Sequence, residues 1–268
     1  MTQLLSAAQA LILVGLAETS KQAEALILAG EVFMGEVRIE KAGQKLKPDA
    51  LPRLRLKSTR NTGHDYVSRG GLKLKAALDA FKLSPSQQLC LDVGASTGGF
   101  TDCLLRHGAQ RVIATDVGYN QLDWRLRQHP AVTCLERTHI KTLTPEALAE
   151  HTGQTAITFC VIDVSFISLL SVLPHVLTLL APQAIIIALL KPQFEFMHVI
   201  EDPEARKAFN GIVKETAHAQ LILETTLTQI QERLAPWHCP QWICSPLKGA
   251  QGNTEFLLHL TSRQNAPC

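Results

Sequence analysis

The sequence has little net charge, no paired cysteines and no uninterrupted apolar span, and each absence excludes a class of protein. Its 26 lysines and arginines stand against 24 acidic residues, so a net charge of +2 provides no global attraction to nucleic acid. Its seven cysteines form no CxxC pair and no metal-ligand spacing, which argues against a zinc site and a disulfide framework. An odd, unpaired set of cysteines is typical of a reducing compartment, and we expect a cytoplasmic protein.

A membrane anchor is not expected either. The N-terminal stretch is apolar, but it lacks the basic start of a signal peptide and continues into helical periodicity. Residues 156–190 are almost continuously apolar, yet Asp163, Pro174, His175 and Pro182 interrupt them before a clean 20-residue span is complete. Parallel strands that helices cover on both faces also form continuous apolar runs. We therefore interpret this region as strand, helix and strand.

The pattern of expected elements changes along the chain. Residues 1–62 combine two helical segments with short strands separated by glycine and proline, which predicts a small α+β domain. Residues 63–84 are expected to form a basic linker and a helix from about Gly71 to Phe81. In residues 85–263 apolar strands alternate with helices. This alternation predicts an α/β, Rossmann-like domain with right-handed crossovers, a mainly parallel sheet and an antiparallel hairpin at one edge.

Basic residues are concentrated in one stretch, although the chain as a whole is nearly neutral. Between positions 53 and 75 the only acid is Asp65. The cations of this basic strip are Arg53, Arg55, Lys57, Arg60, Arg69, Lys73 and Lys75. Such a strip can contact the phosphates of a nucleic acid, and a solvated linker is the alternative interpretation.

The stretch LDVGASTGGFTD, at residues 91–102, predicts a ligand site. An apolar strand ends there, and its glycines let the backbone bend tightly and approach a ligand. The G-x-x-x-G-G spacing differs from dinucleotide and P-loop patterns, and no lysine follows to hold phosphates. With Asp116 closing the next strand as a partner for a ribose, this pattern suits S-adenosylmethionine; a plain strand-to-helix turn is the alternative. The expected cofactor-binding residues are Asp92, Gly94, Ala95, Ser96, Thr97, Gly98, Gly99, Phe100, Asp116 and Val117.

Two later strands also end in a charged residue. Asp163 follows AITFCVI and Lys191 follows AIIIALL, and we expect both strands to neighbour the first one. Both side chains should then emerge at the edge of the sheet that carries the glycine loop. A partly desolvated lysine favours its neutral form, which can take a proton from a hydroxyl, whereas Asp163 would orient it and favour the charged form. A structural salt bridge is the alternative interpretation.

Six motifs occur in order along the chain: VSRGGLKL, LDVGASTGGFTDCLL, DVGYNQL, VIDVSFISL, LLKPQFE and SPLKGAQGNTEFLLHL. From about Val67 to Leu260 they resemble the TlyA family, which comprises hemolysin-named proteins with a ribosomal RNA 2′-O-methyltransferase domain of the FtsJ type. The resemblance implies an S-adenosylmethionine-dependent enzyme whose partners are ribosomal RNA or ribosomal subunits. It also implies that residues 1–62 are an S4-type RNA-binding domain.

The resemblance implies a Lys-Asp-Lys-Glu tetrad. Matched motif by motif, its members are Lys73, Asp163, Lys191 and Glu255. In the family the central lysine, which corresponds to Lys191, helps to deprotonate the ribose 2′-hydroxyl. Its partners hold that lysine and the ribose in line with the sulfonium methyl group. Lys73 and Glu255 are assigned from the resemblance alone, since their spacing does not distinguish them.

The expected S4-type domain departs from the family pattern. Arginines usual near the starts of its two helices are missing from residues 6–8 (SAA) and 19–22 (TSKQ), and the usual Asn-Gly hairpin is Gly35-Glu36. Each lost phosphate contact weakens RNA binding, so the basic strip is expected to contribute more of it. The expected RNA contacts are Lys21, Arg53, Arg55, Lys57, Arg60, Arg69 and Lys75.

Two more departures lie near the expected site. His139 stands where relatives usually have asparagine, and FMHVIEDPEARKAFN after Glu195 replaces the usual Ala-Gly-Arg. Both bear on substrate choice, whereas the intact tetrad and glycine loop argue against an inactive enzyme. Two other functions remain as alternatives: a membrane-damaging hemolysin, and an RNA-binding protein that keeps the cofactor fold without turnover.

Overall fold

The chain divides into two compact units, Met1–Val67 and Ser68–Cys268. The computed structural model describes residues 4–17, 19–28, 30–35, 37–56, 66–153, 157–213 and 216–262. Of the predicted RNA contacts, Lys57 and Arg60 lie outside these ranges.

The first unit combines two short helices with two small antiparallel sheets of strand order β1-β4 and β3-β2-β5. Its elements are β1 (Leu5–Ser6), α1 (Ala7–Leu13), α2 (Ser20–Leu28), β2 (Val32–Met34), β3 (Val37–Arg38), β4 (Lys45–Leu46), the 3-10 helix η1 (Pro48–Arg53) and β5 (Leu54–Leu56). A capping box starts α1: Ser6 Oγ accepts from the backbone N–H of Gln9, and the Gln9 side chain accepts from the N–H of Ser6. This is the α+β content predicted for the N-terminal region.

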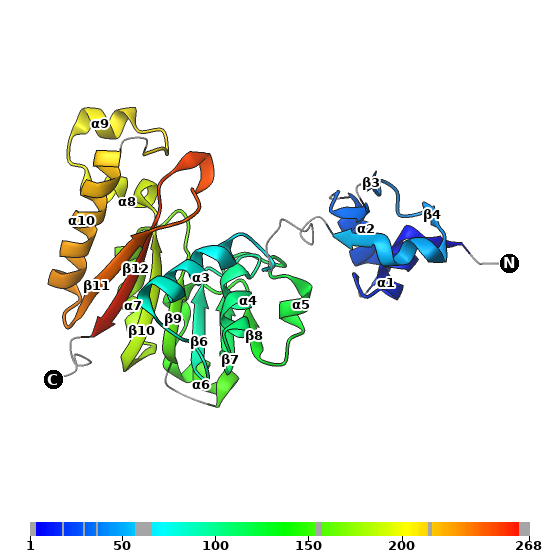
Figure 1. Cartoon of the computed structure of the whole chain (residues 1–268), viewed down its shortest axis with the longest axis horizontal. Coiled ribbons are helices and arrows are strands. Elements are labelled where there is room, and N and C mark those ends of the chain that lie inside the picture. Colours follow the sequence, from blue (N-terminus) through cyan, green and yellow to red (C-terminus); the bar gives the residue numbers. More distant parts are fainter. Residues whose placement is uncertain are drawn as a thin grey trace. The chain divides into compact units, whose positions relative to one another are not determined.

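The second unit is built on a seven-stranded sheet of order β11-β12-β10-β9-β6-β7-β8 (Figure 1). Its strands are β6 (Leu89–Val93), β7 (Arg111–Thr115), β8 (Val132–Leu135), β9 (Ile157–Ile162), β10 (Leu180–Leu190), β11 (Trp237–Cys244) and β12 (Phe256–Ser262). The five from β6 to β10 are parallel, whereas β12 is antiparallel to both β10 and β11. The predicted Rossmann-like sheet with an antiparallel hairpin at one edge is confirmed.

One prediction about strand neighbours is wrong. β9, which leads to Asp163, pairs with β6 as expected. β10, which leads to Lys191, pairs with β9 and β12 instead of β6. After β8 the chain crosses back over β6, and each later parallel strand is added outside the previous one. Lys191 is therefore two strands away from the glycine loop, although it emerges at the same edge of the sheet.

Two groups of helices cover the sheet. In Figure 1, α3 and α4 lie in front of the strands; they contact each other and β6, β7, β11 and β12. Another group, α7 and α10, makes contacts with β10 and β11. The helices of this unit are α3 (Gly70–Phe81), α4 (Gly99–Arg106), α5 (Trp124–Arg127), α6 (Pro145–Thr152), α7 (Leu169–Leu177), α8 (Pro192–Val199), α9 (Pro203–Ala208) and α10 (Thr216–Arg233), with the 3-10 helices η3 (Ile140–Thr142) and η4 (Ala250–Gly252).

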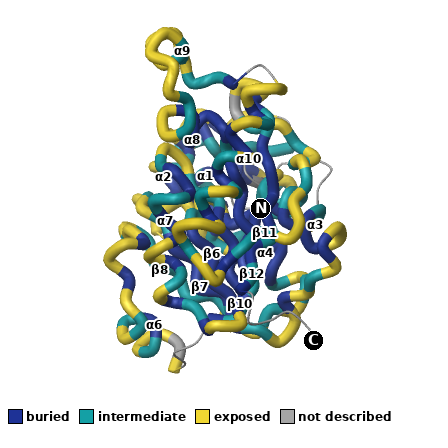
Figure 2. The backbone as a smooth tube through the Cα atoms, turned by 90° about the vertical axis from the view of Figure 1, so that its left-hand side faces the viewer, coloured by how far each residue is buried: buried dark blue, intermediate teal, exposed yellow. Residues whose placement is uncertain are grey.

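Burial explains the long apolar run of the sequence. From Ile157 to Leu190 it becomes β9, α7 and β10, as predicted, and most residues of both strands are buried. Figure 2 shows the central strands of the sheet, β6 and β10 among them, largely in dark blue. Fully buried side chains such as Ile162, Leu173 and Ile186 belong to one cluster with α10. Among the described helices, none has the length and apolar character needed to cross a membrane.

We predict that Leu173→Ala lowers the free energy of unfolding of the second unit by about 2–5 kcal/mol, because it removes a buried side chain from a packed core. Leu173 is 0% exposed on α7, whereas Leu221 on α10 is 48% exposed. The matched Leu221→Ala change should alter the same free energy by less than about 0.5 kcal/mol. All three tryptophans lie in the second unit, so urea unfolding followed by tryptophan fluorescence measures the difference. Equal effects of both changes would contradict this packing.

Candidate active site

The glycine loop after β6 bends against the backbone of Asp163. Gly94 has a φ of +85°, and a Cβ atom there would lie 2.5 Å from the carbonyl oxygen of Asp163. The backbone N–H of Asp163 donates to the carbonyl of Val93 at 2.9 Å. The predicted cofactor loop and the end of β9 are therefore in direct backbone contact.

Asp116 anchors the glycine loop to the end of β7. Its carboxylate accepts hydrogen bonds from the backbone N–H of Ser96 at 2.8 Å and of Gly118 at 2.7 Å. The sequence predicted only a ligand contact for Asp116 and missed this structural role. Its contact with a ribose stays a prediction.

Asp92 lies behind the loop and is fully buried. Thr101 donates a hydrogen bond to Oδ2 at 2.6 Å, whereas Oδ1 has no hydrogen-bond partner among the described residues. Burial raises the pKa of the Asp92 carboxyl to about 7, against the hydrogen bond from Thr101, which lowers it. This acid therefore joins the loop to α4 from the interior of the protein.

Two adjoining cavities open at the carboxyl ends of the parallel strands. The tetrad cavity has a volume of about 460 Å³, and its walls include Lys73, Asp163, Lys191 and Glu255. The β7 cavity has a volume of about 560 Å³, and its walls include Asp116, Val117 and His139. Their shared walls are Gly94, Ser96, Asp163, Ser165 and Phe166. Both volumes are typical of small-molecule sites, and the shared walls allow one ligand to extend through both.

Eight of the ten predicted cofactor-binding residues line one of these two cavities, and Asp92 and Gly98 are the exceptions. Gly98 instead precedes α4 with a φ of +94°, where a Cβ atom would lie 2.3 Å from a methyl group of Leu126. Its small size is therefore required for packing under the loop.

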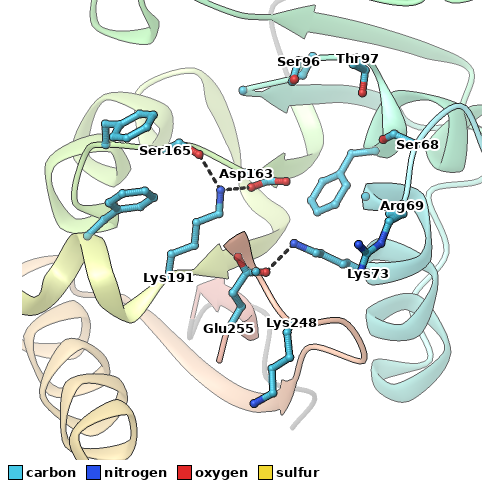
Figure 3. A pocket seen from close by; sticks show the side chains of 18 of the residues that line it. Ser68, Arg69, Lys73, Ser96, Thr97, Asp163, Ser165, Lys191, Lys248 and Glu255 are labelled. Carbon is cyan, nitrogen blue, oxygen red and sulfur yellow. Dashed lines mark hydrogen bonds and ion pairs between the residues drawn. The ribbon is translucent and has the colours of Figure 1, made fainter. Parts of the chain in front are cut away.

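The four residues of the predicted tetrad meet in the tetrad cavity as two ion pairs (Figure 3). Lys191 Nζ lies 2.6 Å from Asp163 Oδ1 and donates a hydrogen bond to Ser165 Oγ at 2.9 Å. Lys73 Nζ, from α3, lies 2.5 Å from Glu255 Oε2 at the start of β12. The side chains of both lysines are largely buried, at 11% and 13% exposed. Pairing with a carboxylate compensates each buried ammonium group.

The tetrad cavity has an excess of positive charge. Its walls contain four cations (Arg69, Lys73, Lys191 and Lys248) and two acids (Asp163 and Glu255), so the formal difference is 4 − 2 = +2. In the described part of the chain, neither Arg69 nor Lys248 has a carboxylate partner, because Asp163 and Glu255 pair with the other two cations. Such a cavity attracts an anionic ligand.

Similarity to known proteins indicates which reaction this site supports. The model of the FtsJ-like methyltransferase family matches residues 66–262. The chain belongs to this family. TlyA of Mycobacterium tuberculosis, named a 16S/23S rRNA (cytidine-2′-O)-methyltransferase, is 37% identical over 256 residues, covering 93% of this chain and 87% of that protein. Hemolysin A of Brachyspira hyodysenteriae is 35% identical over 245 residues, covering 91% and 95%.

Solved structures agree with the TlyA resemblance, which is confirmed. A protein from Streptococcus thermophilus that carries the name hemolysin is 36% identical, with a TM-score of 0.67, and the match covers 100% of this chain and 91% of that one. A similarly named protein from Lactococcus lactis is 40% identical, with a TM-score of 0.64, over 73% of this chain and 88% of that one.

S-adenosylmethionine, the cofactor predicted from the glycine loop, is the methyl donor for an FtsJ-like methyltransferase. The residues present fit this group, because the loop separates two connected cavities of suitable size. Gln193 adds a second observation: it is 9% exposed and lines the tetrad cavity, and its Oε1 atom has no hydrogen-bond partner among the described residues. An unpaired buried acceptor at a cavity wall is typical of a site that a ligand completes.

Several residues that position the tetrad were not predicted from the sequence. Glu195, 1% exposed on α8, accepts hydrogen bonds from Ser168 Oγ at 2.5 Å and from the backbone N–H of Leu169 at 2.6 Å. Burial raises the pKa of its carboxyl, whereas both hydrogen bonds lower it. These bonds hold the loop after Asp163 against the turn that carries Lys191. Only the glutamate of the KPQFE motif could have indicated this role.

Phe166 is an exposed aromatic residue of the same loop. It is 92% exposed, has a φ of +65° and lines both cavities. Its ring centroid lies 5.2 Å from that of Phe194. A strained, exposed aromatic residue at a cavity suggests a ligand-binding role, because the fold does not require it for packing.

Of the described side chains of the basic strip, those of Arg69 and Lys73 line the tetrad cavity. Lys75, two residues further along α3, is exposed and pairs with Asp79 at 2.5 Å. Lys21 and Arg53 are exposed residues of the first unit, and Arg55 lies in β5. RNA contacts by these residues stay predictions.

One departure from the family pattern lies at the site, and the other begins within α8 and continues beyond it. His139 lines the β7 cavity, and its Nδ1 accepts a hydrogen bond from the backbone N–H of Lys141 at 3.1 Å. The changed segment after Glu195 includes α9, which has no buried residue and is yellow in Figure 2. Phe196 and Phe209 stack at 4.1 Å and hold the two ends of this segment together.

We predict that Asp92→Asn becomes more stable relative to the natural protein as pH rises from about 4 to about 7. Because burial raises the pKa of Asp92 from 3.8 to about 7, the folded protein binds more protons than the unfolded chain in this window, and its stability falls as pH rises. Asparagine cannot ionise and can still accept the hydrogen bond from Thr101. Urea unfolding of both proteins at pH 5 and pH 8 measures the change. A difference that stays constant or shrinks with rising pH would contradict the buried, protonated carboxyl.

Proposed function

We propose that this methyltransferase transfers a methyl group from S-adenosylmethionine to a ribose 2′-hydroxyl of ribosomal RNA, with Lys191 as the central residue of a Lys-Asp-Lys-Glu tetrad. The observation that supports this most strongly is the position of the Lys191 amine. It is held between Asp163 and Ser165 in a cavity that shares its walls with the glycine loop. A hydroxyl in this cavity would lie between a basic group and the methyl donor.

The bound cofactor supplies an electrophilic methyl group, and the protein must then remove one proton from the attacking hydroxyl. Lys191 Nζ in its neutral form takes that proton. Asp163, 2.6 Å away, stabilises the ammonium ion that forms.

Lys73 and Glu255 enter the cavity from α3 and β12 and are suited to orient the acceptor nucleotide. Glu255 is 3% exposed and already shares its charge with Lys73, so it can accept a hydrogen bond from a ribose hydroxyl without holding an unpaired charge. Lys73 can donate a hydrogen bond to an oxygen of the same nucleotide. Their pairing fixes both groups before RNA binds, which lowers the entropy lost on positioning the ribose.

Ribosomal RNA is proposed as the acceptor from three features. The tetrad cavity has a formal excess of two positive charges, which suits a phosphate backbone. Phe166 offers an exposed ring on which a nucleobase can stack. The curated relatives in Mycobacterium tuberculosis and Campylobacter jejuni are named rRNA (cytidine-2′-O)-methyltransferases. These names make a cytidine ribose the first acceptor to test.

The first unit is proposed to be an S4-type domain, at residues 1–62, that contributes to RNA binding through Lys21, Arg53 and Arg55. Its helices and short strands are compatible with that class. The methyltransferase domain would then follow the basic linker at residues 63–84 and extend to residue 263. Action in the cytoplasm is supported by the described cysteines, which are all free.

We predict that Lys191→Ala lowers methyl transfer at least about 100-fold, which is the range assigned to a positioned general base. The assay mixes the full chain with labelled S-adenosylmethionine and ribosomal subunits that lack the modification, and nuclease digestion locates the label on the ribose. Binding of S-adenosylmethionine, measured by calorimetry, should remain. Lys82→Ala, at the far end of α3, is the matched control and should keep full activity.

Different results would support other functions. Cofactor binding without transfer to any subunit or free RNA would favour an RNA-binding protein without turnover. Release of dye from liposomes at submicromolar protein would support membrane damage. Full transfer by Lys191→Ala would remove Lys191 from the mechanism while leaving the methyltransferase activity in place.

A further inference from the structure

Lys248 is a cation of the tetrad cavity that lies outside the basic strip. It belongs to the loop between β11 and β12, about 170 positions after the strip, and it is exposed at the cavity wall. Its amino group donates a hydrogen bond to Thr254 Oγ1 at 2.8 Å. In Figure 3, Arg69 and Lys248 lie on either side of the pair formed by Lys73 and Glu255.

The loop that carries Lys248 is fixed by its own hydrogen bonds. Ser245 Oγ donates to the carbonyl of Leu247 at 2.7 Å, and the N–H of Gly249 donates to the carbonyl of Asn253 at 2.9 Å. Asn253, 2% exposed, ties the loop to the segment before α10 by accepting from the N–H of Val213 at 2.8 Å. A fixed loop reduces the entropy lost when its lysine binds a ligand.

The same loop also packs against Glu255, a member of the tetrad. A Cβ atom at Gly249 would lie 2.2 Å from Glu255 Oε1, so the backbone next to Lys248 is packed directly on that carboxylate. The backbone of Lys248 is therefore held at a defined position beside the tetrad, and its exposed side chain extends from that fixed point.

The charges in the cavity leave Lys248 available for an anion. Lys73 and Lys191 are each compensated by a carboxylate, whereas Lys248 bonds only a neutral hydroxyl among the described residues. Exchanging that exposed bond for a phosphate oxygen replaces a neutral hydrogen bond by a charge-assisted one, which is about twice as strong. A lysine is suited to this because its flexible stem lets a point charge reach a phosphate.

We propose that Lys248 binds a backbone phosphate next to the acceptor nucleotide, so that the RNA strand crosses the mouth of the tetrad cavity between Arg69 and Lys248. This inference rests on the proposed function, since it needs an RNA acceptor at the tetrad. It adds a contact from the carboxyl-terminal hairpin to those expected from the basic strip, and it defines a path for the strand across the site.

The test compares Lys248→Met, which keeps the apolar stem, with the natural protein on the same ribosomal RNA. The KM for RNA should rise about fivefold at 0.15 M salt, and the slope of log K against log salt concentration should fall by about 1, since one phosphate contact is lost. The kcat at saturating RNA should stay the same, because the tetrad is intact. Lys248→Arg should restore binding, and Lys82→Met is the matched control.

Equilibrium RNA binding, measured by fluorescence anisotropy on the same variants, separates this inference from the proposed function. If the natural protein binds RNA without transferring a methyl group, the proposed function fails, and the salt slope still decides the role of Lys248. An unchanged affinity and slope in Lys248→Met would overturn the inference. A lower kcat with an unchanged KM would also overturn it, because Lys248 would then act on the tetrad and not on a phosphate.

Discussion

The close contact between Gly94 and the backbone of Asp163 is the constraint on which the site depends. A side chain at Gly94 would collide with the Asp163 carbonyl, and the N–H of Asp163 is already bonded to Val93. Two adjacent parallel strands are therefore held together where one begins the glycine loop and the other leads to Asp163, a member of the proposed tetrad. Lys191 is then placed by Asp163, and Glu195 keeps the intervening loop in position. The two cavities share walls because the backbones of the glycine loop and of Asp163 are in contact.

Much of this arrangement could be predicted from the sequence because it follows from strand periodicity. Buried parallel strands form long apolar runs, and a polar residue after such a run must emerge at the edge of the sheet. That rule placed Asp163 and Lys191 at one site. The same rule does not predict the order of the strands in the sheet. That order depends on where the chain crosses after β8: it returns to pair β9 with β6, and β10 is then added outside β9. The short strand β8 was also missed, because its sequence VTCL is only partly buried and shows no clear pattern.

The remaining site residues depend on long-range packing that spacing does not encode. Lys73 and Glu255 are 182 positions apart and meet only because α3 packs over β12, so the family resemblance was needed to assign them. Phe166 looks like an ordinary apolar residue in VSFISL, and only its 92% exposure distinguishes it. For Asp92 the sequence predicted a ligand contact, because the residue belongs to the cofactor motif. The fold instead buries its side chain behind the loop.

The tetrad cavity contains two kinds of cation: lysines that pair with a carboxylate, and cations at the rim that do not. Each tetrad lysine is compensated by a carboxylate, so the reacting groups together carry no net charge and do not bind phosphate strongly. Under the proposed function, attraction for RNA at this cavity therefore comes from cations at the rim, where Arg69 and Lys248 lack such partners among the described residues. Under the proposed function, a phosphate held at the rim leaves Lys191 and its partners free to act on the ribose. Under the same proposal, cations at the tetrad cavity compensate for the arginines that the sequence lacks at residues 6–8 and 19–22, because part of the RNA affinity is then located beside the tetrad.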